Sequence, residues 1–167
     1  QVGEAIHEVH SRVTRVFRVI GETEEVERNR ELKLIWIHTK CGGVQGATYE
    51  NLGRTVYSEH GCKFVVDVRN VFFTPRLSYE RMRIAKQVEP EETVSVMFGG
   101  VGTYAIIIAK VCPEVEKVYT IDVNPIAHKL ANDNITINRC FEKVVSIFGD
   151  AETVCKEKLA GICDRVI

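Results

Sequence analysis

Residues 93–110 read TVSVMFGGVGTYAIIIAK, in which an apolar, β-branched run breaks into glycines and then resumes as a second apolar run. This order predicts a strand, a glycine turn and a helix. Glycine adopts backbone conformations that other residues avoid, and the first turn of the helix offers unpaired N–H groups. A nucleotide-like ligand is therefore expected at Gly99, Gly100 and Gly102.

Two acidic residues strengthen this prediction. The glycines alone are weak evidence for a nucleotide site, because Gly100–Ala105 fits only the short pattern G-x-G-x-x-G/A, which also occurs in simple tight turns. Asp122 ends the strand-like run 117–122, where a carboxylate accepts hydrogen bonds from ribose hydroxyls. Asp150 follows a third strand-like run. It either caps the next helix or accepts a hydrogen bond from an exocyclic amino group such as that of adenine.

Strand and helix alternate through the second half of the chain. Strands are predicted at 93–98, 117–122, 143–148 and 164–167, and helices at 103–111, 125–138 and 151–160. This alternation, with short connections, predicts an α/β fold with a parallel, Rossmann-like sheet. Because ligands bind beyond the carboxyl ends of such strands, Gly99, Asp122 and Asp150 are expected to share one site.

Residues 1–70 are predicted to form a small α+β domain. The expected elements are a helix at 3–9, strands at 13–20, 31–37, 54–58 and 63–68, an acidic turn at 22–27 and a glycine-rich loop at 39–53. The last two strands flank the turn His60-Gly61 and are expected to pair antiparallel. Trp36 is predicted to be a core residue, and His38 and His60 to have surface or capping roles.

Residues 71–90 are expected to form a linker strand and helix, which lead to the α/β unit at 91–167. Thr74 precedes a proline and is therefore biased away from helix, which makes Pro75 the predicted hinge. A helix is predicted from about Leu77 to Val88. The basic residues in this part of the chain are interpreted as a solvated helix face.

Composition narrows the class of protein. The chain has 167 residues, 45% of them hydrophobic, and a formal net charge of −1, so it can bury an ordinary core but lacks the overall positive charge typical of nucleic-acid binders. It has no apolar run that could cross a bilayer and no signal-like N-terminus, so a cytoplasmic location without membrane contact is expected. The six cysteines follow no metal-ligand spacing; no metal site is expected, and the thiols are predicted to be reduced and partly buried.

Three motifs together resemble the class I methyltransferases that bind S-adenosylmethionine: the glycine turn, Asp122-Val-Asn-Pro125 and Gly149-Asp-Ala151. The segment 72–81, FFTPRLSYER, is more specific and looks like the archaeal and eukaryotic enzymes that methylate N1 of guanosine 37 in tRNA. Residues 1–70 resemble the small middle domain of that family, and residues 71–167 the first half of its catalytic domain. The resemblance implies S-adenosylmethionine as cofactor and the anticodon loop of tRNA as partner.

The resemblance also assigns residues to the cofactor. It implies that Asp122 accepts hydrogen bonds from the ribose hydroxyls, that Val123 packs on the adenine and that Asp150 meets the adenine amino group. The other residues implied at the cofactor are Phe72, Arg76, Leu77, Phe98, Gly99, Gly100, Val101, Asn124 and Ala151.

Two further residues are implied in catalysis. Guanine N1 carries a proton at neutral pH, so methyl transfer to it benefits from a general base and from positive groups that hold O6. By the resemblance, Glu80 is that base and Arg30 positions the substrate. Alternatively, Glu80 pairs with Arg83 or caps the helix.

The chain departs from the family pattern at three places. Val96 stands where the family has an acidic residue, and Gly99 where it has alanine. The sequence stops at Ile167, as the fourth strand begins, so the sheet is expected to be incomplete at its C-terminal half. The chain is therefore interpreted as a fragment with little or no methyl transfer on its own.

Three other functions are alternatives to methyl transfer. Related enzymes transfer the aminocarboxypropyl group of the same cofactor in wyosine synthesis, but they carry Gly-Asn where this chain has Arg76-Leu77. A nicotinamide dehydrogenase would fit the glycine pattern, whereas Asn124-Pro125 and Gly149-Asp150 argue against it. The third alternative is a non-catalytic RNA-binding fragment.

Overall fold

The computed structural model describes residues 2–24, 29–37 and 52–167. The predicted turn beyond residue 24, the glycine-rich loop as far as residue 51, and His38 lie outside these residues. The side chain of Arg30 also lies outside the described part of the chain. Within the described ranges, the strands form two antiparallel pairs and one parallel sheet.

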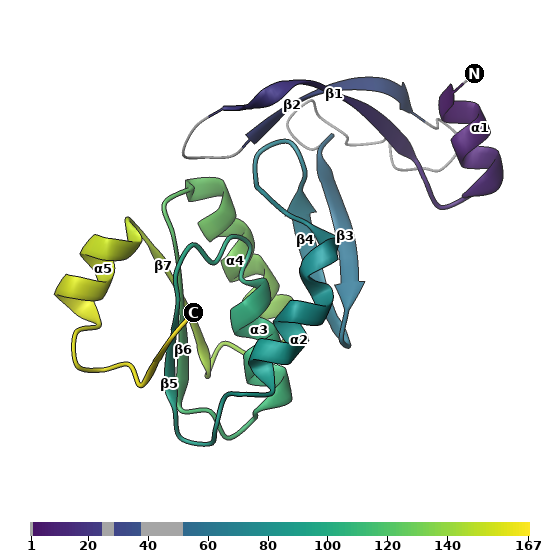
Figure 1. Ribbon diagram of the computed structural model, residues 1–167. Coiled ribbons are helices and arrows are strands. Elements are labelled where there is room, and N and C mark those ends of the chain that lie inside the picture. The colour runs from purple at the N-terminus through teal and green to yellow at the C-terminus, as the bar shows by residue number, and fades with distance from the viewer. Residues whose placement is uncertain (1, 25–28, 38–51) are drawn as a thin grey trace.

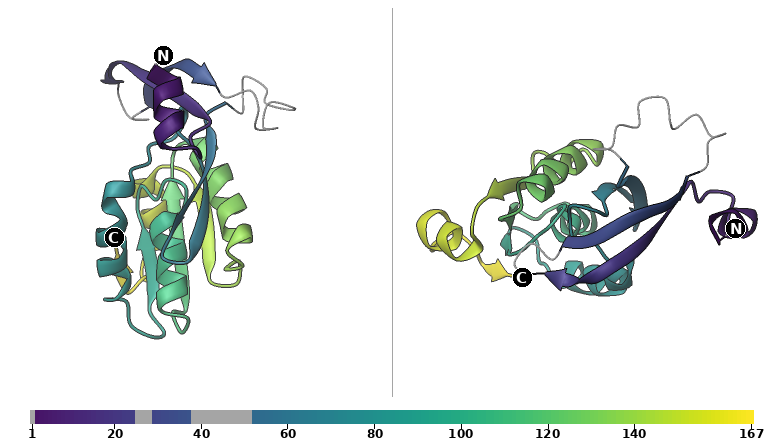
Figure 2. Two further views of the ribbon diagram at one scale, coloured as in Figure 1. Left: turned by 90° about the vertical axis from the view of Figure 1, so that its right-hand side faces the viewer. Right: turned by 90° about the horizontal axis from the view of Figure 1, so that it is seen from above.

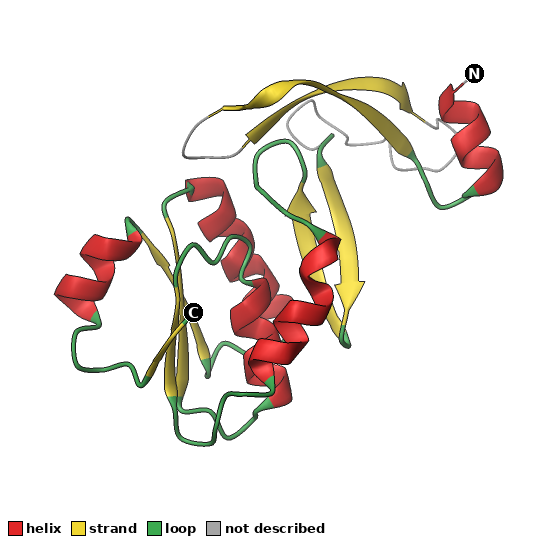
Figure 3. Ribbon diagram, in the orientation of Figure 1, coloured by secondary structure: helices red, strands yellow, loops and turns green. Residues whose placement is uncertain are grey.

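The parallel sheet organises the second half of the chain (Figure 1; Figure 3). Its strands are β5 (Thr93–Val96), β6 (Lys117–Asp122), β7 (Val144–Phe148) and β8 (Arg165–Val166), in the order β7-β6-β5-β8. The helices between them are α3 (Thr103–Val111), α4 (Pro125–Ile137) and α5 (Ala151–Lys158). In Figure 1, α5 lies on one face of the sheet, and α3 and α4 lie on the other. The predicted Rossmann-like α/β fold is confirmed.

Two of these helices begin at residues whose side chains cap them. The Asn124 side chain accepts hydrogen bonds from the first N–H groups of α4, and Pro125 occupies the first helical position, where a missing N–H costs nothing. Asp150 accepts a hydrogen bond from the N–H of Thr153 and so caps α5. Local sequence therefore sets where the chain turns from strand end to helix.

Branched apolar side chains fill the core between the sheet and its helices. Val94, Val118 and Ile107 have no exposed surface, and burying such a side chain stabilises the fold by about 1.5–3 kcal/mol. Phe64 and Val66 belong to the same core and are also fully buried. The strands β3 (Arg54–Glu59) and β4 (Cys62–Asp67) pair antiparallel, as predicted. Strand β4, which carries Phe64 and Val66, packs on α3 and α4.

The first strands form a separate antiparallel pair. Figure 2 shows that α1 (Val2–Val9) lies at the opposite end of the molecule from α5, and that β1 (Arg15–Glu24) and β2 (Asn29–Ile37) run from the side of α1 across the top of the molecule. The acidic turn predicted to begin at residue 22 is wrong there, because β1 runs on to Glu24, which pairs with Asn29. Trp36 is half-buried and packs on α1 beside His7, at a ring distance of 5.5 Å.

The linker folds as a short 3-10 turn, η2 (Pro75–Leu77), followed by α2 (Ser78–Ala85). The helix predicted to reach Val88 ends earlier, because Gln87 and Val88 donate to the carbonyls three residues before them and the last turn tightens. The five described cysteines carry free thiols, as predicted. None of the helices in the described ranges has the length and apolar character to span a membrane.

Candidate active site

The carboxyl ends of β5 and β6 meet at the glycine turn, and the Asp122 carboxylate joins them. Its Oδ2 accepts a hydrogen bond from the N–H of Gly100 at 2.8 Å, and its Oδ1 accepts one from the N–H of Asn124 at 2.8 Å. The N–H of Gly99 donates to the Ile121 carbonyl at 2.8 Å. The sequence prediction that Gly99 and Asp122 share one site is consistent with this geometry.

The backbone of the turn has an unusual conformation. Phe98, Gly100 and Gly102 have φ angles of 55°, 56° and 83°, all in the left-handed region. For a bulky residue such as Phe98, this conformation costs about 1–2 kcal/mol. Helix α3 begins directly after Gly102, which has no side chain to cap it, so the N–H groups of its first turn can bind a polar ligand.

Large apolar side chains are left exposed around this edge of the sheet. Phe98 is 76% exposed, Phe148 53% and Val123 44%, at the ends of β5, β7 and β6 respectively. Phe72 and Leu77 of the linker are 42% and 39% exposed. Exposed apolar groups gathered in this way are typical of a binding surface for a ligand with an apolar ring. Sequence reasoning missed Phe148, whose signal was its position directly before Gly149 at a strand end.

A cavity of about 100 Å³ joins the linker to the glycine turn. Pockets that enclose a whole ligand have about 300–1,000 Å³, so this cavity can hold only one end of a nucleoside-sized molecule. The linker forms one wall of the cavity and the glycine turn forms the other, and predicted site residues line both walls. Four other predicted residues do not line it: Arg76, Asp122, Val123 and Asp150. The lining is Phe72, Phe73, Thr74, Leu77, Arg81, Phe98, Gly99, Gly100, Val101, Thr103 and Tyr104.

Two of the predicted cofactor residues have structural roles in the described contacts. Asn124 is 8% exposed; its Oδ1 caps α4 and its Nδ2 donates to the Asn70 carbonyl at 2.8 Å. Asp150 accepts hydrogen bonds at Oδ1 from the N–H and the hydroxyl of Thr153, both at 2.9 Å. These bonds lower the pKa of the exposed Asp150 carboxyl, which is therefore an ionised acceptor at neutral pH. Ala151, directly after it, is buried.

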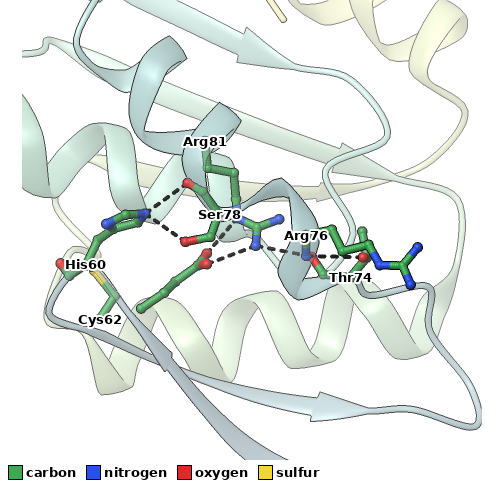
Figure 4. Close-up of polar contacts among 7 residues, drawn as sticks. His60, Cys62, Thr74, Arg76, Ser78 and Arg81 are labelled. Carbon is green, nitrogen blue, oxygen red and sulfur yellow. Dashed lines mark hydrogen bonds and ion pairs between the residues drawn. The ribbon is translucent and has the colours of Figure 1, made fainter.

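A buried ion pair holds the linker segment to the β3–β4 hairpin (Figure 4). Arg81 donates through Nε and Nη2 to the two carboxylate oxygens of Glu59, at 2.5 and 2.9 Å, and also to the Thr74 carbonyl at 3.2 Å. The two charged residues are 2% and 8% exposed. His60 is exposed, as predicted, and its Nε2 lies 2.9 Å from the Ser78 carbonyl oxygen. The sequence interpretation of Arg81 as part of a solvated face is wrong, because its side chain is buried against Glu59.

Glu80 pairs with Arg83, which is the alternative that the sequence left open. Arg83 donates to both carboxylate oxygens, at 2.8 and 2.6 Å, and both side chains are partly exposed. These hydrogen bonds lower the pKa of Glu80. Burial raises the pKa of the Tyr104 phenol, and the charges of Arg81 and Glu80 also act on it. Glu80 is not among the residues that line the cavity, although Arg81, the next residue, is.

Gly99 is matched to Thr120 on the neighbouring strand. A Cβ at residue 99 would collide with the hydroxyl of Thr120, whose side chain is 2% exposed. We expect Gly99→Ala to destabilise the chain by about 1–3 kcal/mol, because an overpacked core must shift. Urea unfolding of G99A, T120A and the double variant tests this, and the second substitution should recover at least about 1 kcal/mol. Strictly additive effects would show that the two positions are independent.

Comparisons with known proteins place this site in a family. Residues 55–167 match the model of the TRM5/TYW2 methyltransferase domain. The tRNA (guanine(37)-N(1))-methyltransferase Trm5b of Pyrococcus abyssi is 38% identical over 154 residues, which cover 92% of this chain and 42% of that relative. The solved complex of aTrm5 and tRNALeu matches with a TM-score of 0.78 and 30% identity, over 99% of this chain and 43% of that one. TYW2 of M. jannaschii in complex with AdoMet matches with a TM-score of 0.65 and 28% identity, over 81% and 53% of the two chains.

Proposed function

Because the chain belongs to the TRM5/TYW2 methyltransferase family, we propose that it transfers a methyl group from S-adenosylmethionine to N1 of guanosine 37 in tRNA. The chain spans 42% of the length of the relative from P. abyssi, so the activity, the tRNA and its anticodon loop are all part of the proposal. The observation that carries it is the cavity in which Phe72 and Leu77 face Gly99 and Gly100. It brings the segment most specific to the family against the glycine turn.

The residues at the sheet edge fit S-adenosylmethionine, which supplies an electrophilic methyl group when bound. Asp122 already orients the N–H of Gly100, and its carboxylate has further lone pairs for ribose hydroxyls. Val123 and Phe148 offer exposed apolar surface for an adenine ring, and the ionised Asp150 offers an acceptor for its amino group. The uncapped first turn of α3 offers N–H donors beside them.

Glu80 is the proposed general base. Its two oxygens each accept a hydrogen bond from Arg83, which leaves each a lone pair for the proton of guanine N1. Removal of that proton frees the nitrogen lone pair for bond formation. Arg30, which lies on β2, is the proposed positioning residue; β2 begins on the side of the carboxyl-terminal edge of the parallel sheet (Figure 1).

We also propose that residues 1–70 act as a substrate-binding unit, 71–90 as a linker and 91–167 as the cofactor-binding unit. The buried contacts of β4 with α3 and α4 show that the β3–β4 hairpin is attached to the unit at 91–167. The hairpin can therefore set where the linker lies relative to the glycine turn.

Ligand titration tests the proposed function. We expect the chain to bind S-adenosylhomocysteine in a calorimetric titration and to show no heat of binding with NAD. Asp122→Asn should weaken this binding by roughly 10- to 100-fold, because charge-assisted hydrogen bonds are worth about 1.5–3 kcal/mol each. Asp133→Asn, at an exposed position on α4, is the matched control and should change nothing. Binding of NAD instead, or equal affinities of the two variants, would contradict the proposal.

Aminocarboxypropyl transfer is the second candidate, since the family name also covers the TYW2 enzymes. The Pro75-Arg76-Leu77 sequence, whose Leu77 lines the cavity, favours methyl transfer. Mass analysis of the nucleoside after incubation with tRNA distinguishes the two groups.

A further inference from the structure

Helix α4 is joined to strand β4 by the side chains of two asparagines. Each side-chain amide accepts from the N–H and donates to the carbonyl of one residue of β4, as the backbone of a neighbouring strand would. Asn138 accepts from the N–H of Lys63 at 2.9 Å and donates to its carbonyl at 2.7 Å. One helical turn earlier, Asn134 accepts from the N–H of Val65 at 2.7 Å and donates to its carbonyl at 3.1 Å. Residues four apart lie on one helix face, and residues two apart lie on one side of a strand, so the two pairs form a matched ladder.

Only one of these asparagines also reaches the glycine turn. Nδ2 of Asn134 donates a second hydrogen bond, at 3.0 Å, to the carbonyl of Val101. Asn134 has no exposed surface, and Val101 is 2% exposed, so no water competes for this bond. The additional bond of Asn138 goes to the Asn134 carbonyl of the same helix, at 2.8 Å. The two side chains therefore differ in one contact that matters for the site.

We infer that Asn134 is a positioning residue that fixes the glycine turn relative to the β3–β4 hairpin. Val101 stands between Gly100 and Gly102, and both glycines have left-handed φ angles. Glycine can take many other backbone conformations, so contacts from outside the turn are needed to hold this one. Asp122 holds one side of the turn through Gly100, and Asn134 holds the other through Val101. Without that amide, the buried Val101 carbonyl would lose its described partner.

The same hairpin also carries the other wall of the cavity. Glu59, at the end of β3, binds Arg81, which in turn donates to the Thr74 carbonyl. Asn134 ties β4 to Val101, on the wall formed by the glycine turn. The hairpin thus fixes the spacing of the two walls, and Asn134 connects the hairpin to the glycine turn. This inference rests on the proposed function, since it treats that cavity as part of the cofactor site.

A matched pair of variants tests the inference. Asn134→Asp and Asn138→Asp each replace an amide donor by a carboxylate that faces backbone carbonyls, so both should destabilise the chain in urea unfolding. Only Asn134→Asp should weaken binding of S-adenosylhomocysteine, by about tenfold, the equivalent of one net hydrogen bond. Equal affinity of both variants, measured where each is folded, would overturn the inference.

A second measurement is independent of ligand binding. Asn134→Ser keeps a small donor and serves where the aspartate variant does not fold. In hydrogen exchange, it should speed exchange of the Gly102 amide, which donates to Gly99 across the turn, by about tenfold, whereas Asn138→Ser should not. Equal exchange rates would overturn the inference. If the unchanged chain does not bind S-adenosylhomocysteine, the proposed function fails, and the exchange rates still decide the role of Asn134.

Discussion

Arg81→Met will lower the free energy of unfolding by about 3–5 kcal/mol, because it leaves the Glu59 carboxylate buried without its cation. The pair is bidentate, with Nε–Oε1 and Nη2–Oε2 distances of 2.5 and 2.9 Å, and both residues are almost completely buried. Methionine keeps the apolar stem of the side chain, so lost packing contributes little. Urea unfolding, followed by the fluorescence of Trp36 and by circular dichroism, measures the change.

Arg83→Met is the matched control. Arg83 lies on the same helix and also pairs with a glutamate, but that pair is partly exposed and solvent screens it. Its effect on stability should therefore be much smaller. The double variant Glu59→Leu/Arg81→Met should recover most of the loss, because replacing both charges by apolar groups removes the desolvation cost. Equal losses for R81M and R83M, or no recovery in the double variant, would contradict the role assigned to the buried pair.

The ion pair also shows why part of the site could not be predicted from sequence. Arg81 stands in a row of charges that is typical of a solvated helix face, and its partner lies 22 residues away in a different element. Asn134 likewise looks like one of several polar residues on α4, although it is fully buried against β4. Burial of a polar side chain depends on which elements meet in three dimensions. A local sequence pattern cannot predict such contacts.

Elements with local signals were predicted well. The bounds of α3 and β6 follow from the glycine turn and from Asp122, and the starts of α4 and α5 follow from their caps. The prediction failed at β1, where pairing between Glu24 and Asn29 continues a strand through an acidic stretch that looks like a turn. Tertiary pairing overrides propensity there. The gathering of Phe72, Leu77 and the glycine turn in one cavity, by contrast, was implied by the family resemblance.

Glu80→Gln is expected to lower the rate of methyl transfer to guanosine 37 by about 10²–10⁴-fold, because glutamine cannot take the proton of guanine N1. The rate would be measured on unmodified tRNA transcript with a chimaera, in which this chain replaces the matching 42% of the P. abyssi relative. Glu152→Gln is the control: Glu152 forms a comparable exposed pair with Lys156 on α5. Equal rates for the two variants would show that Glu80 is not the base.

Arg83 should set the pH range of that base. Its hydrogen bonds hold the pKa of Glu80 below the ordinary value, and a base acts only above its pKa. Arg83→Met removes these bonds, so the pKa of Glu80 should rise toward the ordinary value of a glutamate and the acid limb of kcat/KM should move to higher pH. The folded-state pKa lies below the unfolded one, so the pair stabilises the fold above the unfolded-state pKa, and this contribution is lost as the pH falls through the folded-state pKa. R83M should therefore also reduce the loss of stability at acid pH. An acid limb that stays in place while this stability change occurs would assign the catalytic proton to a group other than Glu80.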